Sequence, residues 1–246
     1  MPQHVGSKWR KTSVLLQSRS LQNIVPRTVR FNRNTLMKML QHYGMVYIKP
    51  DKGRHGKGVF RVERANGQYR FQAGKVKRNY HSYLTMFQAI RKETKGRSYL
   101  VQRGIHLLKY KGRRFDLRVM VQLNPRRKWE TTGIIGRVAA PGKVVTNYHN
   151  GGTPMSANRL LGRHLSKSAV ANKVRFLEKM GVKTGKVMRK AFSGVSEIGV
   201  DIGLDHSLTP WIIEVNTSPD PFIFRKLPDP AVFRKIRRYA QVYGRL

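Results

Sequence analysis

The 246-residue sequence contains no cysteine, which excludes disulfide bonds and thiolate chemistry while leaving the redox compartment open. Zinc would have to rely on the eight histidines, but these are scattered without an H-E-x-x-H motif or a close H-x-H pair, so we assign none of them to a metal. Near the N-terminus, Val14-Leu15-Leu16 is too short for a signal peptide or a membrane span. We therefore expect a protein that is made and kept in the cytoplasm and has no membrane span.

Acidic side chains are scarce, because 12 Asp and Glu stand against 50 Lys and Arg and leave a formal net charge of +38. A charge of this size attracts polyanions, and nucleic acid, an anionic cell-wall polymer, polyglutamate and polyphosphate all fit it. A generically basic surface is the alternative. The hydrophobic content of 39% is enough for one large or two modest globular units, so the chain is not a disordered tail.

The sequence alternates between helical and extended patterns. Residues 1 to about 30 are basic and weakly patterned, and regular structure is expected from about Asn32 onward. The spacing of apolar residues and the capping residues predict helices at about 32–44, 83–96, 169–190 and from 230 onward, the third of them interrupted near Gly181. Strands are predicted at 45–49, 99–102, 115–123, 130–139, 197–204 and 211–216.

The segment Glu214-Val215-Asn216 has the pattern of a metal site on a strand. Residues two apart on a strand point to the same face, so Glu214 and Asn216 project together while Ile213 and Val215 enter the opposite, apolar side. Two oxygen ligands therefore converge on one face. A chance pair of half-buried strands is the alternative interpretation of this motif alone.

A third oxygen ligand comes from the preceding strand if the two strands form a hairpin. The intervening residues 205–210 have turn composition, and if Asp205 faces Pro210 across the turn, Asp201 pairs directly with Glu214. Two carboxylates that close repel each other unless a cation lies between them. Hard oxygen ligands of this kind favour magnesium, manganese or calcium over zinc.

Lys49 ends a predicted strand and is followed by a loop with the spacing Gly53-x-x-Gly56-x-Gly58. Glycines allow backbone N–H groups to approach phosphate oxygens, and Lys49 can add a fixed positive charge. The spacing matches neither G-x-G-x-x-G opening a helix nor G-x-x-x-x-G-K-[ST], which excludes Rossmann and P-loop sites. A plain basic hairpin turn explains the loop at least as well when it is taken alone.

The predicted strand 115–121 alternates apolar residues with Asp116 and Arg118, which therefore share one face. An arginine there could neutralise the charge of a transferring phosphate. Arg137, on the partner strand, is a second candidate. The alternative is an Asp–Arg pair on a solvated strand face.

Taken in chain order, these motifs resemble those of ATP-grasp enzymes. The residues that carry the resemblance are Lys49, the loop 53–58, Gln102, Asp116-Leu117-Arg118, Asp201 and Glu214-Val215-Asn216. The segments 114–121 and 145–153 look most like the YheC/YheD-type, endospore coat-associated branch of that superfamily. The resemblance runs from about residue 30 to the C-terminus, so only about 30 residues precede it, where most ATP-grasp enzymes carry a further domain that helps to hold the acceptor.

The resemblance implies an α+β fold in which two α+β subdomains with mainly antiparallel sheets clamp ATP. It divides the chain into a basic arm or domain remnant at 1–30, a nucleotide-clamping subdomain at 31–106 and a catalytic, metal-binding subdomain at 107–246. The implied phosphate ligands are Lys49, Gly56, Lys57 and Gly58, and the implied adenine-facing hinge runs from Gln102 to Ile105. Arg118 and Arg137 would stabilise the phosphates, and Asp201, Glu214 and Asn216 would bind Mg²⁺, with Mn²⁺ as the alternative.

Two further residues have open roles under this resemblance. The family's second nucleotide-contacting lysine has no unambiguous match here, and Lys75 is either that lysine or, as the better interpretation, a surface lysine. Asn147 either faces phosphate or acceptor or belongs to an ordinary turn.

The leading function implied by the resemblance is that of a Mg-ATP-dependent carboxylate-amine ligase that acts through an acyl phosphate. Its carboxylate and amine substrates are unidentified, and an anionic polymer or other acidic partner accounts for the charge. The alternatives are an ATP-grasp kinase of a polyanionic substrate and a non-catalytic, polyanion-binding coat or scaffold protein that retains the fold. The spore or the spore coat is then an alternative to the cytoplasm as the location.

Overall fold

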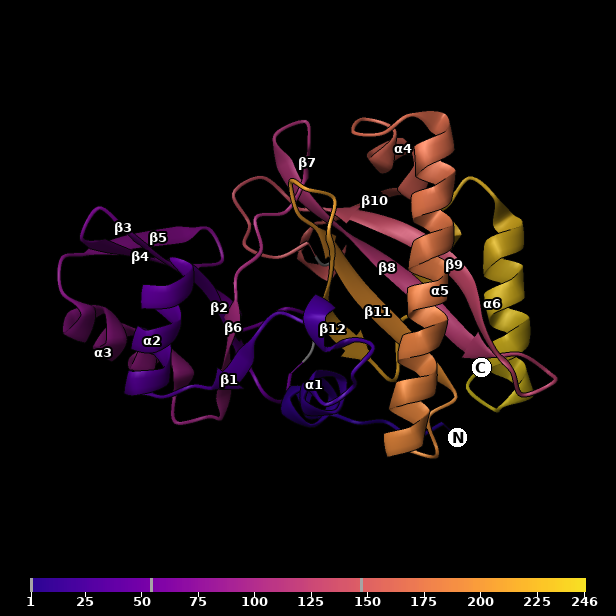
Figure 1. Ribbon diagram of the computed structural model, residues 1–246, viewed down its shortest axis with the longest axis horizontal. Coiled ribbons are helices and arrows are strands. Elements are labelled where there is room, and N and C mark those ends of the chain that lie inside the picture. The colour runs from indigo at the N-terminus through magenta and orange to yellow at the C-terminus, as the bar shows by residue number, and fades with distance from the viewer. Residues whose placement is uncertain (1, 54, 147) are drawn as a thin grey trace.

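The computed structural model describes residues 2–53, 55–146 and 148–246, and Figure 1 shows two α+β lobes built on separate sheets. The smaller lobe contains a six-stranded antiparallel sheet in the order β1-β6-β2-β3-β4-β5, and the larger lobe an antiparallel sheet in the order β10-β9-β8-β11-β12, with β7 paired to β8. The first sheet consists of β1 (Thr28–Arg30), β2 (Met45–Pro50), β3 (Phe60–Ala65), β4 (Gln68–Ala73), β5 (Val76–Tyr80) and β6 (Tyr99–Arg103). The strands of the larger lobe are β7 (Lys109–Tyr110), β8 (Arg113–Leu123), β9 (Trp129–Val138), β10 (Thr153–Ser156), β11 (Glu197–Leu204) and β12 (Pro210–Asn216).

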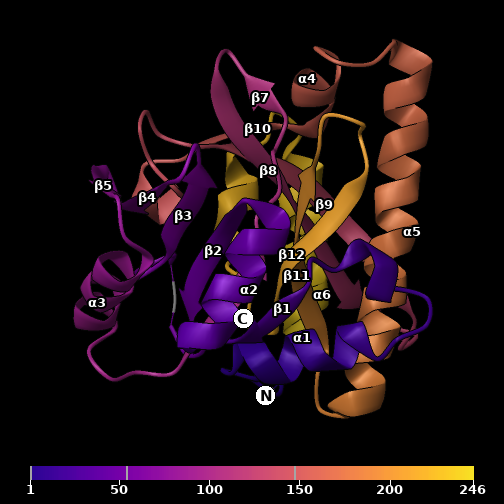
Figure 2. The same ribbon diagram turned by 60° about the vertical axis from the view of Figure 1, so that its left-hand side comes forward.

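Helices α2 (Arg33–Tyr43) and α3 (Tyr83–Thr94) cover one face of the smaller sheet. Asn32 caps α2 by accepting a hydrogen bond from the backbone N–H of Thr35, and Gly44, with φ of 67°, ends it in a conformation that favours glycine. Figure 2 shows both helices on the outer side of the sheet. These helices begin and end close to the positions that the sequence predicts.

The opposite face of the smaller sheet is polar and looks toward the larger lobe. On β2, Val46 and Ile48 are buried in the core under the helices, so the alternation of a strand turns Tyr47 and Lys49 to the other face. Tyr47 pairs with Gln102 of β6, which adds a further polar side chain to that face. The alternation of β2 therefore decides that Lys49 faces the space between the lobes.

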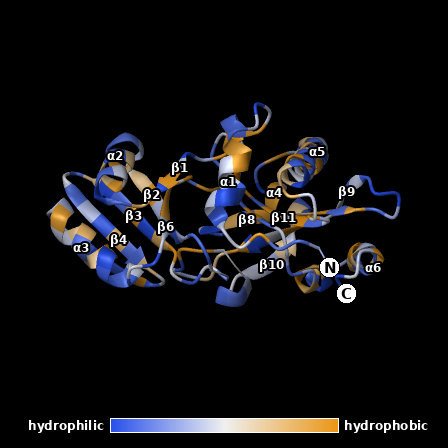
Figure 3. Ribbon diagram, turned by 90° about the horizontal axis from the view of Figure 1, so that it is seen from below, coloured by the Kyte–Doolittle hydropathy of each residue, from blue (hydrophilic) through white to orange (hydrophobic). Residues whose placement is uncertain are grey.

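One face of the larger sheet packs against α1 (Lys8–Leu16), α4 (Ala157–Leu161) and the long helix α5 (Lys167–Ala191). The other face packs against α6 (Pro230–Val242) and the 3₁₀ segment η3 (Phe222–Lys226), and short 3₁₀ segments also occur as η1 (Gln22–Ile24) and η2 (Tyr148–Asn150). In Figure 3 these helices carry both hydrophobic and hydrophilic ribbon, as expected of helices that cover a sheet with one side. None of the described helices combines the length and the apolar character needed to cross a membrane.

Helix α5 is continuous, so the predicted interruption near Gly181 is wrong. Gly181 and Gly185 lie one turn apart on its buried side, where they allow the helix backbone to approach the sheet. A Cβ at position 181 would lie 2.9 Å from Val119, and one at position 185 would lie 2.7 Å from the ring of Trp129. The glycines therefore serve close packing of helix on sheet instead of ending the helix.

Strand β8 is buried on both faces and supplies two different surfaces. Phe115, Leu117 and Val119 pack into the core beneath α5, while Met120 on the alternate face packs against η3 and α6. Asp116 and Arg118 share this second face but lie nearer the start of the strand, among residues that line a cavity. The part of this face of β8 around Met120 belongs to the hydrophobic core, whereas Asp116 and Arg118 can contact a ligand in the cavity.

The first 30 residues are more regular than the sequence indicates, because α1, η1 and β1 all precede Asn32. Leu15, Leu21 and Val25 are buried in the core of the larger lobe, whereas β1 pairs with β6 of the smaller lobe. These few apolar residues have too little periodicity to predict a helix, and their burial depends on distant parts of the chain. The proposed division at residues 30 and 106 stays a prediction.

Candidate active site

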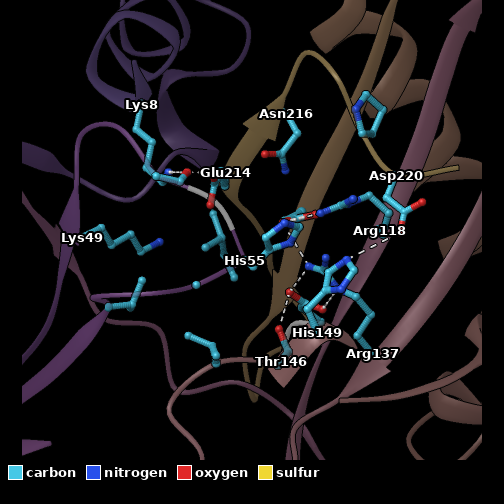
Figure 4. A pocket seen from close by; sticks show the side chains of 18 of the residues that line it. Lys8, Lys49, His55, Arg118, Arg137, Thr146, His149, Glu214, Asn216 and Asp220 are labelled. Atoms are coloured by element: carbon cyan, nitrogen blue, oxygen red, sulfur yellow. Dashed lines mark hydrogen bonds and ion pairs between the residues drawn. The ribbon is translucent and has the colours of Figure 1, made fainter. Parts of the chain in front are cut away.

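A cavity of about 610 Å³ lies between the polar faces of the two sheets. Figure 4 shows Lys49 on one wall, Arg118 and Arg137 on the opposite wall, and Lys8 and Glu214 together above them. All predicted site residues line this cavity except Gly58. The residues brought together are Lys49, Gly56, Lys57, Gln102, Ile105, Arg118, Arg137, Asp201, Glu214 and Asn216.

The loop between β2 and β3 uses glycine where the backbone requires it. Gly56 and Gly58 have φ of 70° and 72°, in the left-handed region that side chains disfavour. Gly58 is also packed tightly, since a Cβ there would lie 2.8 Å from the hydroxyl of Tyr99. Lys57 is exposed at the cavity rim, and residue 54 of the predicted loop lies outside the described residues.

A row of charged residues crosses three strands of the larger sheet. Arg118 of β8 is directly opposite Asp201 of β11, and Asp201 is directly opposite Glu214 of β12. Directly opposed residues on antiparallel strands share one face, so the predicted pairing of Asp201 with Glu214 is confirmed. Asp116 and Arg137 form a second opposed pair between β8 and β9.

The Asp201–Glu214 pair is the predicted one, but the residues paired at the turn of the hairpin differ from the prediction. Leu204, and not Asp205, pairs with Pro210, so the register at the turn is shifted by one residue. An irregularity between Asp201 and Ile202 then inserts one extra residue on β12, and the register beyond it restores the Asp201–Glu214 pair.

The same irregularity changes which residues of β12 face the cavity. The core of the larger lobe contains Ile212 and Val215, which are three residues apart instead of two. Ile213 lines the cavity beside Glu214, so the prediction that Ile213 enters the apolar side is wrong. Together with Ile105 and Leu107 it adds apolar surface near the connection between the lobes.

Two aspartates and two arginines form a buried network on this wall. Asp201 accepts hydrogen bonds from Nε of Arg118, from Nη2 of Arg118 at 3.0 Å and from Nη2 of Arg137 at 3.0 Å. Asp116 accepts from Nε and Nη2 of Arg137 at 2.8 and 2.6 Å and from the hydroxyl of Thr146 at 2.7 Å. The predicted shared face of Asp116 and Arg118 is confirmed, but it is buried and not solvated.

The network changes the acidity of its members. Burial raises the pKa of Asp201, but the guanidinium groups of Arg118 and Arg137 outweigh burial and hold that pKa at about 2. Burial lowers the pKa of Arg137, but Asp116 and Asp201 raise it above its ordinary value. Asp201 and Arg137 are therefore ionised at neutral pH, and the hydrogen bonds of the network hold both arginines in place at the cavity wall.

Lys49 stands opposite this network in a poorly solvated position. Its Nζ donates a hydrogen bond of 2.6 Å to Oε1 of Gln102, whose amide donates in turn to the hydroxyl of Thr28 and to the carbonyl of Ile213. Burial lowers the pKa of Lys49 from 10.5 to about 8, against the raising effect of Glu214. The ammonium group is held by a neutral partner, so an anion entering the cavity would stabilise its charge.

The predicted metal ligands differ in the number of contacts that their side-chain oxygens already make. Both oxygens of Asp201 already accept hydrogen bonds from arginine, whereas Glu214 has an ammonium group, Nζ of Lys8, at 3.4 Å from Oε1. Asn216 lines the cavity two residues beyond Glu214. Within the described residues, no group of three His, Asp or Glu side chains lies close enough to hold a metal ion. Glu214 and Asn216 therefore fit a divalent cation better than Asp201, and the metal role of all three stays a prediction.

Sequence reasoning missed the contribution of α1 to the cavity. Lys8 and Lys11 both line it, and burial lowers the pKa of Lys11. The capping residue Ser7 was the available signal, since its side chain accepts a hydrogen bond from the backbone N–H of Arg10. Nothing in the local pattern indicates that this helix would reach β12.

Two histidines near the cavity have no recognisable motif in the sequence. The rings of His55 and His149 pack with centroids 4.1 Å apart, and His149 lies 3.7 Å from a carboxylate oxygen of Asp220. Lys75, the candidate second phosphate lysine, is not among the residues that line the cavity. Asn147 lies outside the described residues.

The two-sheet fold with its intervening cavity is that of the ATP-grasp class. The chain resembles the solved structure of D-cycloserine synthetase DcsG with a TM-score of 0.58, 11% identity and coverage of 96% of this chain and 70% of that one. It also resembles carboxyaminoimidazole ribonucleotide synthase from Aspergillus clavatus, solved with ATP, with a TM-score of 0.53, 13% identity and coverage of 87% and 45%. These likenesses confirm the predicted fold.

Residues 2–246 match the family model described as YheC/D like ATP-grasp, and the chain belongs to this family. It is 27% identical over 191 residues to the endospore coat-associated protein YheD of Bacillus subtilis (strain 168). That match covers 74% of this chain but only 41% of the curated relative. The predicted family is therefore confirmed, and membership supports an ATP-dependent function.

Proposed function

We propose that this chain is a Mg-ATP-dependent carboxylate-amine ligase. The cavity between the lobes supports this function. The smaller lobe contributes the buried Lys49 and the glycine loop to one wall, and the larger lobe contributes the row of Arg118, Asp201 and Glu214 to the opposite wall. Cations on both walls suit a polyphosphate chain, and an acidic residue among them suits a metal that accompanies it. The ATP-grasp family and fold support the same conclusion.

The residues divide into groups with separate tasks. Lys49 binds phosphate and is positioned by Gln102, while backbone N–H groups of the loop around Gly56 approach the phosphates. Ile105, Leu107 and Ile213 provide apolar surface for the adenine ring.

The opposite wall handles the charge that develops during transfer. Arg118 and Arg137 stabilise phosphate oxygens, and Asp201 keeps both guanidinium groups oriented. Glu214 and Asn216 would hold magnesium, which supplies charge neutralisation to the phosphates when it is bound.

The reaction needs no side-chain nucleophile. A substrate carboxylate oxygen attacks the γ-phosphorus of ATP, the bond to the bridging oxygen breaks, and ADP leaves. An amine then attacks the carbonyl carbon of the acyl phosphate, and inorganic phosphate leaves as the nitrogen loses a proton to solvent. Positioning and electrostatics supply the rate enhancement, as in other phosphoryl transfers. We further propose an acidic or polymeric partner, in view of the net charge of +38, and an association with the spore coat, in view of the name of YheD.

Glu214→Gln tests the metal assignment. The variant should weaken Mg²⁺-dependent ATP binding about tenfold or more, because it removes a charged oxygen ligand, and it should leave binding to a polyanion such as heparin nearly unchanged. Calorimetric titration with a non-hydrolysable ATP analogue, with and without Mg²⁺, measures the difference. Glu93→Gln, on α3 and outside the cavity, is the matched control. Unchanged Mg²⁺ dependence in the Glu214 variant would refute the assignment.

Product analysis separates the three candidate functions. Mass spectrometry of reactions with ATP, candidate carboxylates, amines and anionic polymers should detect an amide, ADP and phosphate if the chain is a ligase. A phosphorylated polymer without a requirement for amine identifies a kinase. Salt-sensitive polymer binding with no acceptor-dependent turnover identifies a non-catalytic binding protein.

A further inference from the structure

Helix α1 precedes the strands of both sheets in the chain, and its first turn lies at the cavity between the two lobes. The side chain of Lys8 is only 11% exposed, and its Nζ donates a hydrogen bond of 2.9 Å to the carbonyl of Gly53 while lying 3.4 Å from Oε1 of Glu214. Figure 4 shows the side chains of Lys8 and Glu214 pointing toward each other. One ammonium group therefore contacts the phosphate loop of the smaller lobe and the proposed metal ligand of the larger lobe.

The start of α1 is fixed to the smaller lobe through a single aspartate. The hydroxyl of Ser7 donates to both carboxylate oxygens of Asp51, at 2.9 and 3.0 Å, and the backbone N–H of Trp9 donates to Oδ1 at 2.8 Å. The backbone N–H of Lys8 donates to the carbonyl of the same aspartate. Because Asp51 lies two residues after Lys49, the first turn of α1 is bound to the beginning of the phosphate loop.

The chain just before α1 is fixed to the larger lobe. The backbone N–H of Val5 donates a buried hydrogen bond of 2.8 Å to the hydroxyl of Thr217, which directly follows Asn216. Residues 5–9 thus have hydrogen bonds to both lobes, and the anchors Asp51 and Thr217 lie within two residues of the proposed ligands Lys49 and Asn216. Such a segment positions Lys8 with little freedom.

The charges around Lys8 do not balance. Lys8, Lys11 and Lys49 lie near two carboxylates, those of Glu214 and Asp51, while both oxygens of Asp201 accept hydrogen bonds from arginines. Positive charge is therefore in excess on the side of the cavity where the phosphate loop lies. A multiply charged anion that enters there would be stabilised by more than one ammonium group.

We propose that Lys8 is a phosphate-binding residue of the nucleotide site, supplied by the N-terminal segment. The inference rests on the proposed ATP-dependent function and extends it to a residue outside both sheets. Without nucleotide, the ammonium group neutralises Glu214. Glu214 would hold the cation, and the ammonium group of Lys8 would then be free to turn from Oε1 to a phosphate oxygen, a short displacement that its flexible stem permits.

Nucleotide binding to Lys8→Gln tests this inference. Calorimetric titration with Mg²⁺ and a non-hydrolysable ATP analogue should show affinity reduced about tenfold or more, since a charge-assisted hydrogen bond is lost. The affinity should also become less sensitive to salt. Lys8→Arg retains the charge and should recover most of the affinity. Lys92→Gln, on the exposed side of α3, is the control for charge alone.

Adenosine, which has no phosphate, separates a phosphate contact from a structural role. Its affinity should be equal in the wild-type protein and in the Lys8→Gln variant. An equal loss of adenosine and ATP-analogue affinity, or wild-type affinity for both, would overturn the assignment of Lys8 while the proposed function stands. Failure of the wild-type protein to bind the ATP analogue would overturn the proposed function as well. Thermal denaturation of each variant shows that the comparison is made on folded protein.

Discussion

Replacing Lys49 by methionine should stabilise the folded protein at neutral pH although it removes a site residue. The difference between an ordinary pKa of 10.5 and a folded pKa of about 8 corresponds to about 3 kcal/mol at neutral pH, because each pKa unit is worth about 1.4 kcal/mol. Loss of the hydrogen bond to Gln102 offsets about 1 kcal/mol of this gain. The expected net increase in the free energy of unfolding is therefore about 2 kcal/mol.

The pH dependence of this effect has a definite sign. Below pH 8, Lys49 is charged in the folded and the unfolded states, so its burial destabilises the folded protein in full. Between pH 8 and about 10.5 the folded protein carries a neutral amine while the unfolded chain still binds the proton, so wild-type stability rises relative to the variant. The advantage of Lys49→Met should therefore shrink steadily as the pH increases from 8 to 10.5.

Urea denaturation of wild type and Lys49→Met at a series of pH values measures the two free energies. Lys92→Met, which replaces an exposed lysine on α3, should change stability little at any pH and is the matched control. A lower stability of Lys49→Met at pH 7, or an equal effect of the substitution at pH 7 and pH 10, would show that burial of the Lys49 ammonium group does not destabilise the folded protein. The same variant should bind the ATP analogue weakly, which would mark Lys49 as a site residue retained at the expense of stability.

Two further predictions concern the larger lobe. Asp201→Asn should lower the free energy of unfolding by about 3–5 kcal/mol in urea denaturation, because it leaves the buried guanidinium group of Arg118 without its carboxylate partner while Arg137 keeps its pair with Asp116, whereas Asp229→Asn at the exposed cap of α6 should have little effect. Since the folded pKa of Asp201 is about 2 against an ordinary 3.8, about 2 kcal/mol of wild-type stability should be lost as the pH falls from 4 to 2, and the variant should not show this loss. Gly185→Ala should destabilise by about 1–3 kcal/mol through its contact with Trp129, although alanine favours helices; a gain of stability would show that close packing of α5 is not required.

Part of the fold and of the site was predictable because it depends on local patterns. Caps and apolar spacing located α2, α3 and α6, and strand alternation placed Asp116 with Arg118 and Glu214 with Asn216 on common faces. The pairing of Asp201 with Glu214 followed from the composition of the turn, but the register was right only because the extra residue on β12 compensated for the shifted turn. A bulge has no local signature in this sequence, so the position of Ile213 could not be predicted.

The order of the motifs was enough to identify the family, and the resemblance to that family implied the two antiparallel sheets. The periods of helix and strand located individual elements and the chemical types of the site residues. Which charged side chains come into contact depends on the folded arrangement of the chain. This arrangement buried the Asp–Arg network, left Lys49 with a neutral partner and brought Lys8 to Glu214 from 206 positions away in the chain. Burial and ion pairing depend on contacts between segments that are distant in the chain, and such contacts leave no periodic signal in the sequence.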